Sequence, residues 1–203
     1  MTDASDTHIV RLKITLDEVK PLVVRRIEVP LDIKLSNLHL AIQATMPWLN
    51  YHLYEFRVRD TGWGIPDPEF GDGPRDARKA TLQDVIDDTD AKSFKYLYDF
   101  GDGWEHTIKI EAITSPEPGA TYPRFIDAKG RCPPEDVGGP PGYEEYLSAV
   151  ADREHERHGE LIKWGGAFDP SNVNTGQISK DLAALAKKFN RKPAQRKSKV
   201  QKQ

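Results

Sequence analysis

The segment Phe94–Glu111 constrains the fold of this chain most, because it has the pattern of a β-hairpin. Apolar and aromatic residues alternate with polar ones on both sides of a Gly-Asp-Gly turn. Alternation with a period of two predicts strands with one buried face, and turn glycines supply the positive φ angles that tight hairpins need. We therefore expect two antiparallel strands whose turn region carries three polar side chains, those of Asp99, Asp102 and His106.

The register of this hairpin decides what those side chains can do. A two-residue turn at Asp102-Gly103, or a four-residue loop from Gly101 to Trp104, would place Asp99 opposite His106, with Cβ atoms about 5 Å apart. Such a pair can act as a base or hold a metal ion. A three-residue loop would place Tyr98 opposite His106 instead. The alternative to a functional role is a core histidine that hydrogen-bonds to a buried aspartate, and the sequence leaves both interpretations open.

Length and composition limit the number of domains and the class of protein. The chain has 203 residues, of which 37% are hydrophobic, which is enough for one core and too little for two full domains. Its single cysteine, Cys132, excludes an intrachain disulfide framework. No apolar run approaches the roughly 18 residues of a membrane span. We expect a cytoplasmic protein without membrane contact.

Charge is distributed unevenly along the chain. Residues 187–203 contain eight of the 29 Lys and Arg residues and no acid, so residues 1–186 carry a net charge of −11. A basic end that contains Pro193 and no aromatic residue after Phe189 is typical of disorder. We expect one domain over residues 1–186 and a basic disordered tail over 187–203. The tail is either a solvated end or an arm for non-specific nucleic acid contact.

The order of periodic segments predicts the fold class. Two strands precede an amphipathic helix, a third strand, a short helix and the hairpin described above, and two helical patterns follow. We expect an α+β fold, an α/β roll in which a β-grasp-like hairpin–helix–strand–hairpin sheet is followed by C-terminal helices. His52 shares the apolar face of the third strand, which favours a core position. The segments are 10–16, 22–29, 35–46, 52–59, 81–86, 94–111, 142–162 and 178–189, with a surface loop over 60–79.

A segment rich in proline and glycine, residues 115–142, follows the hairpin. Prolines interrupt both helices and ladders, so we expect this segment to run over the surface. It contains Cys132, Glu135 and Asp136 next to two prolines. A rigid loop with paired carboxylates can bind a divalent cation or position a base. The alternative is that these acids hydrogen-bond the loop's own backbone amides.

Several motifs together resemble the plasmid pRiA4b ORF-3-like family over roughly residues 8–186. The resemblance implies an α/β roll, an association with plasmids and insertion elements, and a resolvase-like label, without a defined activity. A serine recombinase needs an activated serine among arginines, and this sequence does not supply one. Val24 replaces a family tryptophan and Val137 a family cysteine, which weakens a thiolate-rich metal site. The motifs are Ile14-Thr-Leu, Arg25-Arg-Ile-Glu-Val-Pro, Leu38-His, Ala41-Ile, Met46-Pro-Trp, His52-Leu, Glu55-Phe, Tyr96-Leu-Tyr-Asp-Phe-Gly-Asp-Gly-Trp-Glu-His, Cys132-Pro-Pro-Glu-Asp-Val-Gly-Gly, Gly142-Tyr and Phe168-Asp-Pro.

Two classes of function remain. In the first, the chain is a small enzyme or metal-dependent protein, and the hairpin turn and the proline-rich loop form either an acid–base site or a site for a divalent metal; the sequence leaves the cofactor open. In the second, the chain is an accessory nucleic-acid-binding or protein-binding module for plasmid or transposon functions. An acidic body disfavours broad contact with duplex DNA, so we favour a module of undefined activity that carries a carboxylate and histidine site. Its expected catalytic residues are Asp99, Asp102, His106, Glu135 and Asp136, and its expected metal ligands are His106, Asp99 and Cys132.

Overall fold

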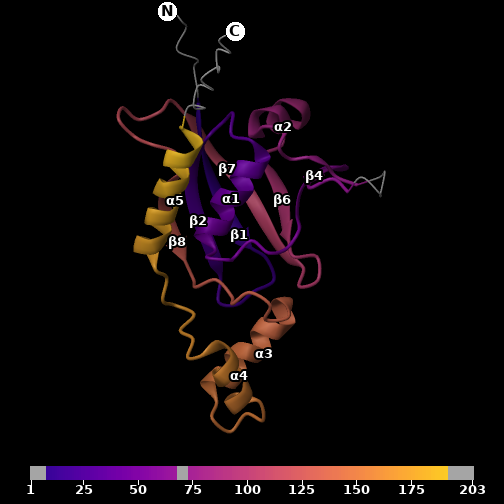
Figure 1. Ribbon diagram of the computed structural model, residues 1–203, viewed down its shortest axis with the longest axis vertical. Coiled ribbons are helices and arrows are strands. Elements are labelled where there is room, and N and C mark those ends of the chain that lie inside the picture. Colours follow the sequence, from indigo (N-terminus) through magenta and orange to yellow (C-terminus); the bar gives the residue numbers. More distant parts are fainter. Residues whose placement is uncertain (1–7, 68–72, 192–203) are drawn as a thin grey trace, which may run out of the picture.

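A computed structural model of the protein describes residues 8–67 and 73–191. Within these ranges, eight strands form one sheet in the order β5-β4-β3-β6-β7-β1-β2-β8 (Figure 1). Neighbouring strands are antiparallel, except that β4 and β5 are parallel. The strands are β1 Ile9–Leu16, β2 Val23–Pro30, β3 Tyr54–Val58, β4 Thr61–Gly64, β5 Arg75–Asp76, β6 Ser93–Tyr98, β7 Trp104–Thr114 and β8 Arg124–Lys129.

Four of the helices form two pairs, α1 with α5 and α3 with α4. Helix α1 crosses one face of the sheet, and α5 packs against both α1 and β8 (Figure 1). Helices α3 and α4 pack against each other beyond the end of the sheet that carries the β6–β7 turn. The expected α+β class is confirmed. The helices are α1 Leu35–Thr45, α2 Leu82–Thr89, α3 Gly139–Ala151, α4 His158–Gly165 and α5 Thr175–Phe189.

The two faces of the sheet differ in polarity, as its alternating sequence requires. On β1, the side chains of Leu12 and Ile14 are fully buried on the helix-covered face, whereas Arg11 points to the opposite face. There Arg11 forms an ion pair of 2.8 Å with Glu28 of β2. An antiparallel sheet can keep one face in water in this way.

The register of the β6–β7 hairpin differs from every alternative that the sequence suggested. Tyr98 pairs with Trp104, and Tyr96 pairs with His106, so five residues, 99–103, connect the strands. The expected pairing of Asp99 with His106 is therefore wrong, and so is the alternative with Tyr98. The reason is that Asp99 adopts a left-handed φ of 56° and leaves the strand. Its Oδ1 accepts hydrogen bonds from the amides of Gly101 (3.0 Å) and Asp102 (3.4 Å), as aspartates in turns commonly do.

Three other expectations about chain segments need correction. The proline-rich segment does form a strand, β8, because residues 124–129 between Pro123 and Gly130 contain no proline and can add to the sheet edge. The loop expected over 60–79 contributes β4 and β5. The single helix expected over 142–162 is two helices separated by a break at residues 152–157.

The C-terminal helix runs past the expected domain boundary. Helix α5 ends at Phe189, so the first three residues of the expected 187–203 tail belong to a helix. Residues 192–203, which hold most of the expected tail, lie outside the described residues. No helix in the described parts of the chain is long and apolar enough to cross a membrane.

Candidate functional site

The β6–β7 turn and the loop of residues 130–139, called the proline loop below, pack on each other as expected from the sequence. Asp102 accepts a hydrogen bond from the Gly138 amide through Oδ2 (3.1 Å). Gly139, with a φ of 69°, lies so close to the turn that a Cβ would stand 2.2 Å from the Asp102 carbonyl oxygen. Only glycine fits there. The role of Asp102 in the structure is thus to hold the proline loop against the turn.

A second set of hydrogen bonds ties the proline loop to the segment after α1. The Tyr98 hydroxyl donates to the Glu135 carboxylate and accepts from the Tyr51 amide (3.2 Å). The other Glu135 oxygen accepts from the Leu49 amide (2.6 Å). Burial, and next the Glu135 carboxylate, raise the pKa of Tyr98, so its hydroxyl stays a donor at neutral pH. Glu135 is therefore fixed in place by two other segments of the chain, strand β6 and the residues after α1.

Three side chains from three segments meet beside this network and form what we call the His–Asp cluster: His52, Asp99 and Asp136. One potential ligand atom of each lies within 4.8 Å of the other two. His52 Nε2 is 2.9 Å from Asp136 Oδ1 and 3.6 Å from Asp99 Oδ2. Asp99 is buried, His52 is partly exposed and Asp136 is exposed. The cluster consequently has one side anchored in the protein and one side open to solvent.

The donor set of the cluster indicates which ions it suits. Imidazole nitrogen with carboxylate oxygen is a common ligand set for Zn²⁺ and Mn²⁺, whereas Mg²⁺ and Ca²⁺ prefer oxygen ligands alone. Three protein ligands leave a coordination position for water, as in catalytic zinc sites. Without a cation, His52 Nε2 lies within hydrogen-bond distance of the Asp136 carboxylate. The arrangement can therefore support metal-assisted or general acid–base chemistry.

Exposed apolar side chains stand next to the cluster in the sequence. Leu49, Tyr51 and Leu53 precede or flank His52, and Phe100 follows Asp99. The Asp99 amide donates to the Leu53 carbonyl oxygen (2.9 Å), which holds the two segments together. We call these four residues the apolar rim. Large apolar side chains at the edge of a polar cluster are typical of a surface that contacts a ligand.

The structure places His106 and Cys132 in the core. His106 is completely buried, and its Nδ1 lies 3.1–3.2 Å from the carbonyl oxygens of Tyr96 and Trp104, so Nδ1 carries the hydrogen. Burial lowers the pKa of His106 to about 4 and keeps the ring neutral. Burial also raises the pKa of the Cys132 thiol, which disfavours the thiolate that binds metals. Among the described residues, neither belongs to a group of three potential ligands.

The structure thus unites only part of the expected site. Asp99 and Asp136 meet in the cluster, Glu135 lies next to it through Tyr98, and Asp102 is used for loop packing. His52, expected in the core, was missed as a site residue. Strand β3 begins at Tyr54, so the alternation that suggested burial does not extend back to position 52. No sequence pattern identifies it, because the exposure of its neighbours Tyr51 and Leu53 is known only from the structure.

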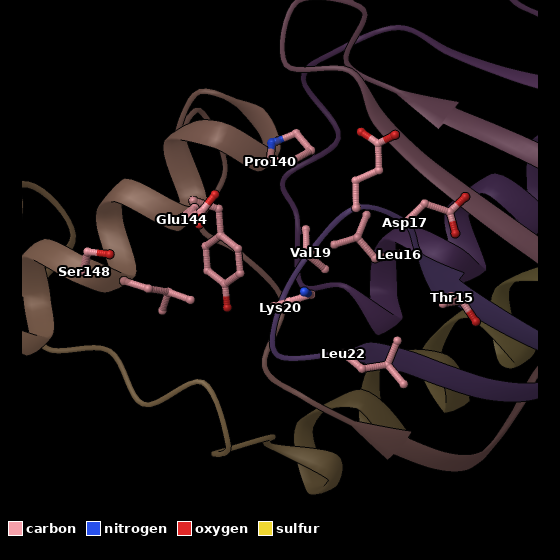
Figure 2. A pocket seen from close by; sticks show the side chains of 12 residues that line it. Thr15, Leu16, Asp17, Val19, Lys20, Leu22, Pro140, Glu144 and Ser148 are labelled. Carbon is pink, nitrogen blue, oxygen red and sulfur yellow. The ribbon is translucent and has the colours of Figure 1, made fainter.

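A separate cavity of about 740 Å³ lies between the β1–β2 turn and α3 (Figure 2). Lys20 from the turn and Glu144 from α3 face this cavity from opposite sides. Asp17, a third charged residue of its lining, already accepts hydrogen bonds from Lys95 (2.6 Å) and Thr107 (2.8 Å). Among the described residues, this cavity brings no three metal-ligating side chains together. It does not compete with the His–Asp cluster as a metal centre.

Comparisons with known proteins agree with the resemblance seen in the sequence. The family described as plasmid pRiA4b ORF-3-like protein matches residues 8–177. The uncharacterized protein y4hQ of Sinorhizobium fredii is 56% identical over 186 residues, which cover 91% of this chain and 95% of that protein. The crystal structure of MM3350, a protein of unknown function from Methanosarcina mazei Go1, has a TM-score of 0.76 and 34% identity, and the match covers 87% of this chain and 98% of that one. The chain belongs to the plasmid pRiA4b ORF-3-like family.

Proposed function

We propose that this member of the plasmid pRiA4b ORF-3-like family binds a divalent transition-metal cation, Zn²⁺ or Mn²⁺, through His52, Asp99 and Asp136. The observation that carries the proposal is the meeting of three ligating atoms within 4.8 Å, although their residues are far apart in the sequence. Two carboxylates together carry two negative charges, which one dication balances.

The spacing of the ligand atoms supports this assignment. Around a tetrahedral ion with bonds of about 2.1 Å, ligand atoms stand about 3.4 Å apart. The separations of His52 Nε2 from the two carboxylates, 2.9 and 3.6 Å, bracket that value. Asp136 is exposed and can adjust by rotating its side chain. Asp99 is oriented by the turn, because its other oxygen, Oδ1, accepts hydrogen bonds from turn amides. Ligating carboxylates in metal sites commonly receive such hydrogen bonds.

The cation would supply an activated water, because coordination lowers the pKa of bound water toward neutrality. Glu135 precedes Asp136 in the chain and is held between the Tyr98 hydroxyl and the Leu49 amide, which fixes a further carboxylate beside the cluster. The apolar rim would contact the apolar part of a substrate. We accordingly favour metal-assisted hydrolysis as the reaction class, with His52, Asp99 and Asp136 as ligands.

Calorimetric titration of the full-length chain with zinc, manganese, magnesium and calcium chlorides tests the proposal. Asp136→Asn removes one ligand at an exposed position and should weaken zinc binding at least about tenfold. Asp90→Asn is a matched control, because Asp90 is also exposed and also has a left-handed φ, 50° against 58° for Asp136. We expect one zinc ion per chain for the wild type and for Asp90→Asn.

Two results would overturn the assignment. The first is zinc binding by Asp136→Asn and His52→Gln with wild-type affinity, which would place the ion elsewhere. The second is tighter binding of magnesium or calcium than of zinc, because an imidazole ligand should favour the transition metal.

A further inference from the structure

A pocket of about 600 Å³ lies at the start of α5, where this helix meets the end of α1 and the proline loop. Its size is within the range of small-molecule sites, about 300–1,000 Å³. Its lining includes two arginines, Arg25 and Arg131, together with Asn174, Thr175 and Gly176 at the N-terminus of α5. None of these residues belongs to the His–Asp cluster.

Arg25 is a buried cation that has no carboxylate partner among the described residues. Only 1% of the surface of Arg25 is exposed to solvent. Nε donates to the carbonyl oxygen of Thr45 (2.7 Å), and Nη1 donates to those of Val24, Lys129 and Gly130 (2.8–3.1 Å). All four acceptors are neutral. A buried charge is costly unless a counterion accompanies it, so the absence of a protein counterion points to an anion from outside.

The remaining nitrogen of Arg25 is the group that can bind this anion. Nη2 has no acceptor within the part of the chain that the structure describes, whereas Nε and Nη1 are fully used. Because Arg25 also lines the pocket, its free donors are available there. Burial lowers the pKa of Arg25, which agrees with a guanidinium whose charge the protein itself leaves uncompensated.

The N-terminus of α5 adds a second donor to the same pocket. Asn174 caps this 15-residue helix by accepting from the Gln177 amide (3.0 Å). The Gly176 amide, in the first turn, has no acceptor among the described residues. A helix N-terminus with a free amide favours anions. Arg131 brings a further positive charge, and its guanidinium is held over the Phe168 ring at 4.3 Å.

We propose that this pocket binds the phosphate group of a small phosphorylated molecule, with Arg25 Nη2 and the Gly176 amide as donors to the phosphate oxygens. Hydrogen bonds from a guanidinium nitrogen to phosphate oxygens are charge-assisted and therefore strong. Asp181 also lines the pocket and accepts a hydrogen bond from Gln177 (2.8 Å). Its negative charge repels phosphate, so the phosphate lies at the Arg25 end and Asp181 accepts from hydroxyl groups of the ligand.

Calorimetric titration of the full-length chain distinguishes the two sources of phosphate. Ribose 5-phosphate and inorganic phosphate serve as probes, with sodium chloride at matched ionic strength as the reference. We expect saturable binding at one site, with ribose 5-phosphate the tighter ligand because its hydroxyls occupy the rest of the pocket. Inorganic phosphate binding at least as tightly would overturn the organic part of the proposal, and no saturable binding of either probe would overturn all of it.

A pair of glycine substitutions tests the location. Gly176→Asp places a carboxylate in the first turn of α5, where a Cβ meets its nearest atom at an ordinary 3.7 Å. Gly159→Asp makes the same change at the second residue of α4, where a Cβ meets nothing within 4 Å. Acids in a first turn favour the helix, so both variants should fold. Gly176→Asp should weaken ribose 5-phosphate binding at least about tenfold.

Gly159→Asp should leave that affinity unchanged. Equal affinities for the wild type and both variants would show that the phosphate binds elsewhere. An equal loss in both variants would show that it follows the net charge of the protein. Zinc titrations of the same variants keep this test separate from the His–Asp cluster, because zinc binding should be the same in all three proteins.

Discussion

Acidification should destabilise the protein, because two histidines are buried as neutral rings. His39 is hydrogen-bonded through Nδ1 to the Tyr96 hydroxyl (2.8 Å) and through Nε2 to Asn50 (2.6 Å), and His106 bonds only to backbone carbonyls. Burial lowers the pKa of each from 6.5 to about 4. Between these two pH values the unfolded chain binds more protons than the folded chain, so stability is full above pH 6.5 and is lost as the pH falls toward 4.

The size of this effect follows from the pKa difference. Each unit of difference corresponds to about 1.4 kcal/mol, so full acidification costs about 3 kcal/mol per histidine. At a pH of about 5, the loss relative to neutral pH is about 2 kcal/mol per histidine and about 4 kcal/mol for the pair. This loss is a large fraction of the free energy of unfolding of a typical domain, which is roughly 5–15 kcal/mol.

Urea unfolding at a pH of about 7.5 and of about 5 measures this difference. His106→Gln should lower stability at both pH values but reduce the difference between them by about 2 kcal/mol, because only one buried imidazole remains. His155→Gln, at a partly exposed histidine, should leave the difference unchanged. A difference below about 1 kcal/mol in the wild type, or an unchanged one in His106→Gln, would refute the reasoning.

Three further outcomes are expected. Tyr98→Phe removes the hydroxyl that joins Glu135 to the Tyr51 amide. It should lower the free energy of unfolding in urea by about 1–3 kcal/mol and weaken zinc binding. An unchanged free energy of unfolding together with unchanged zinc affinity would contradict the network. Gly139→Ala should destabilise by more than about 2 kcal/mol, because its Cβ would clash with Asp102, while Gly159→Ala should be neutral or stabilising. Deleting residues 192–203 should abolish any salt-sensitive, non-specific DNA binding measured by fluorescence anisotropy, and persistence of that binding would exclude the basic tail as its source.

The sheet could be predicted from the sequence because alternation reports directly which face of a strand is buried. The strands around 10–16, 22–29 and 94–111 were confirmed for that reason. Strand β8 could not be predicted from alternation, because its residues are only partly buried at the sheet edge and lie among prolines. The predicted hairpin register was wrong, because the Asp99 backbone adopts a left-handed conformation in addition to the turn glycine and lengthens the turn.

The candidate site was harder to predict than the fold, because it depends on contacts between distant segments. The proline loop and the hairpin turn were expected to meet, and Asp99 and Asp136 do lie together. His106 was expected at the site because of its strand position, but that position faces the aromatic core beside Trp48. His52 takes its place in the proposed site, and no local pattern shows that the chain between α1 and β3 passes the turn. The structure reveals this through the hydrogen bond from the Asp99 amide to the Leu53 carbonyl oxygen and through those from the amides of residues 49 and 51 to Glu135 and Tyr98.

A crystal structure of the protein grown with zinc, with anomalous difference maps recorded above and below the zinc absorption edge, tests the metal assignment most directly. We expect one peak about 2.0–2.2 Å from His52 Nε2 and from one oxygen each of Asp99 and Asp136. A zinc peak at His106 or Cys132 would contradict the assignment. So would the absence of a peak between His52, Asp99 and Asp136 when the protein is fully saturated with zinc in solution.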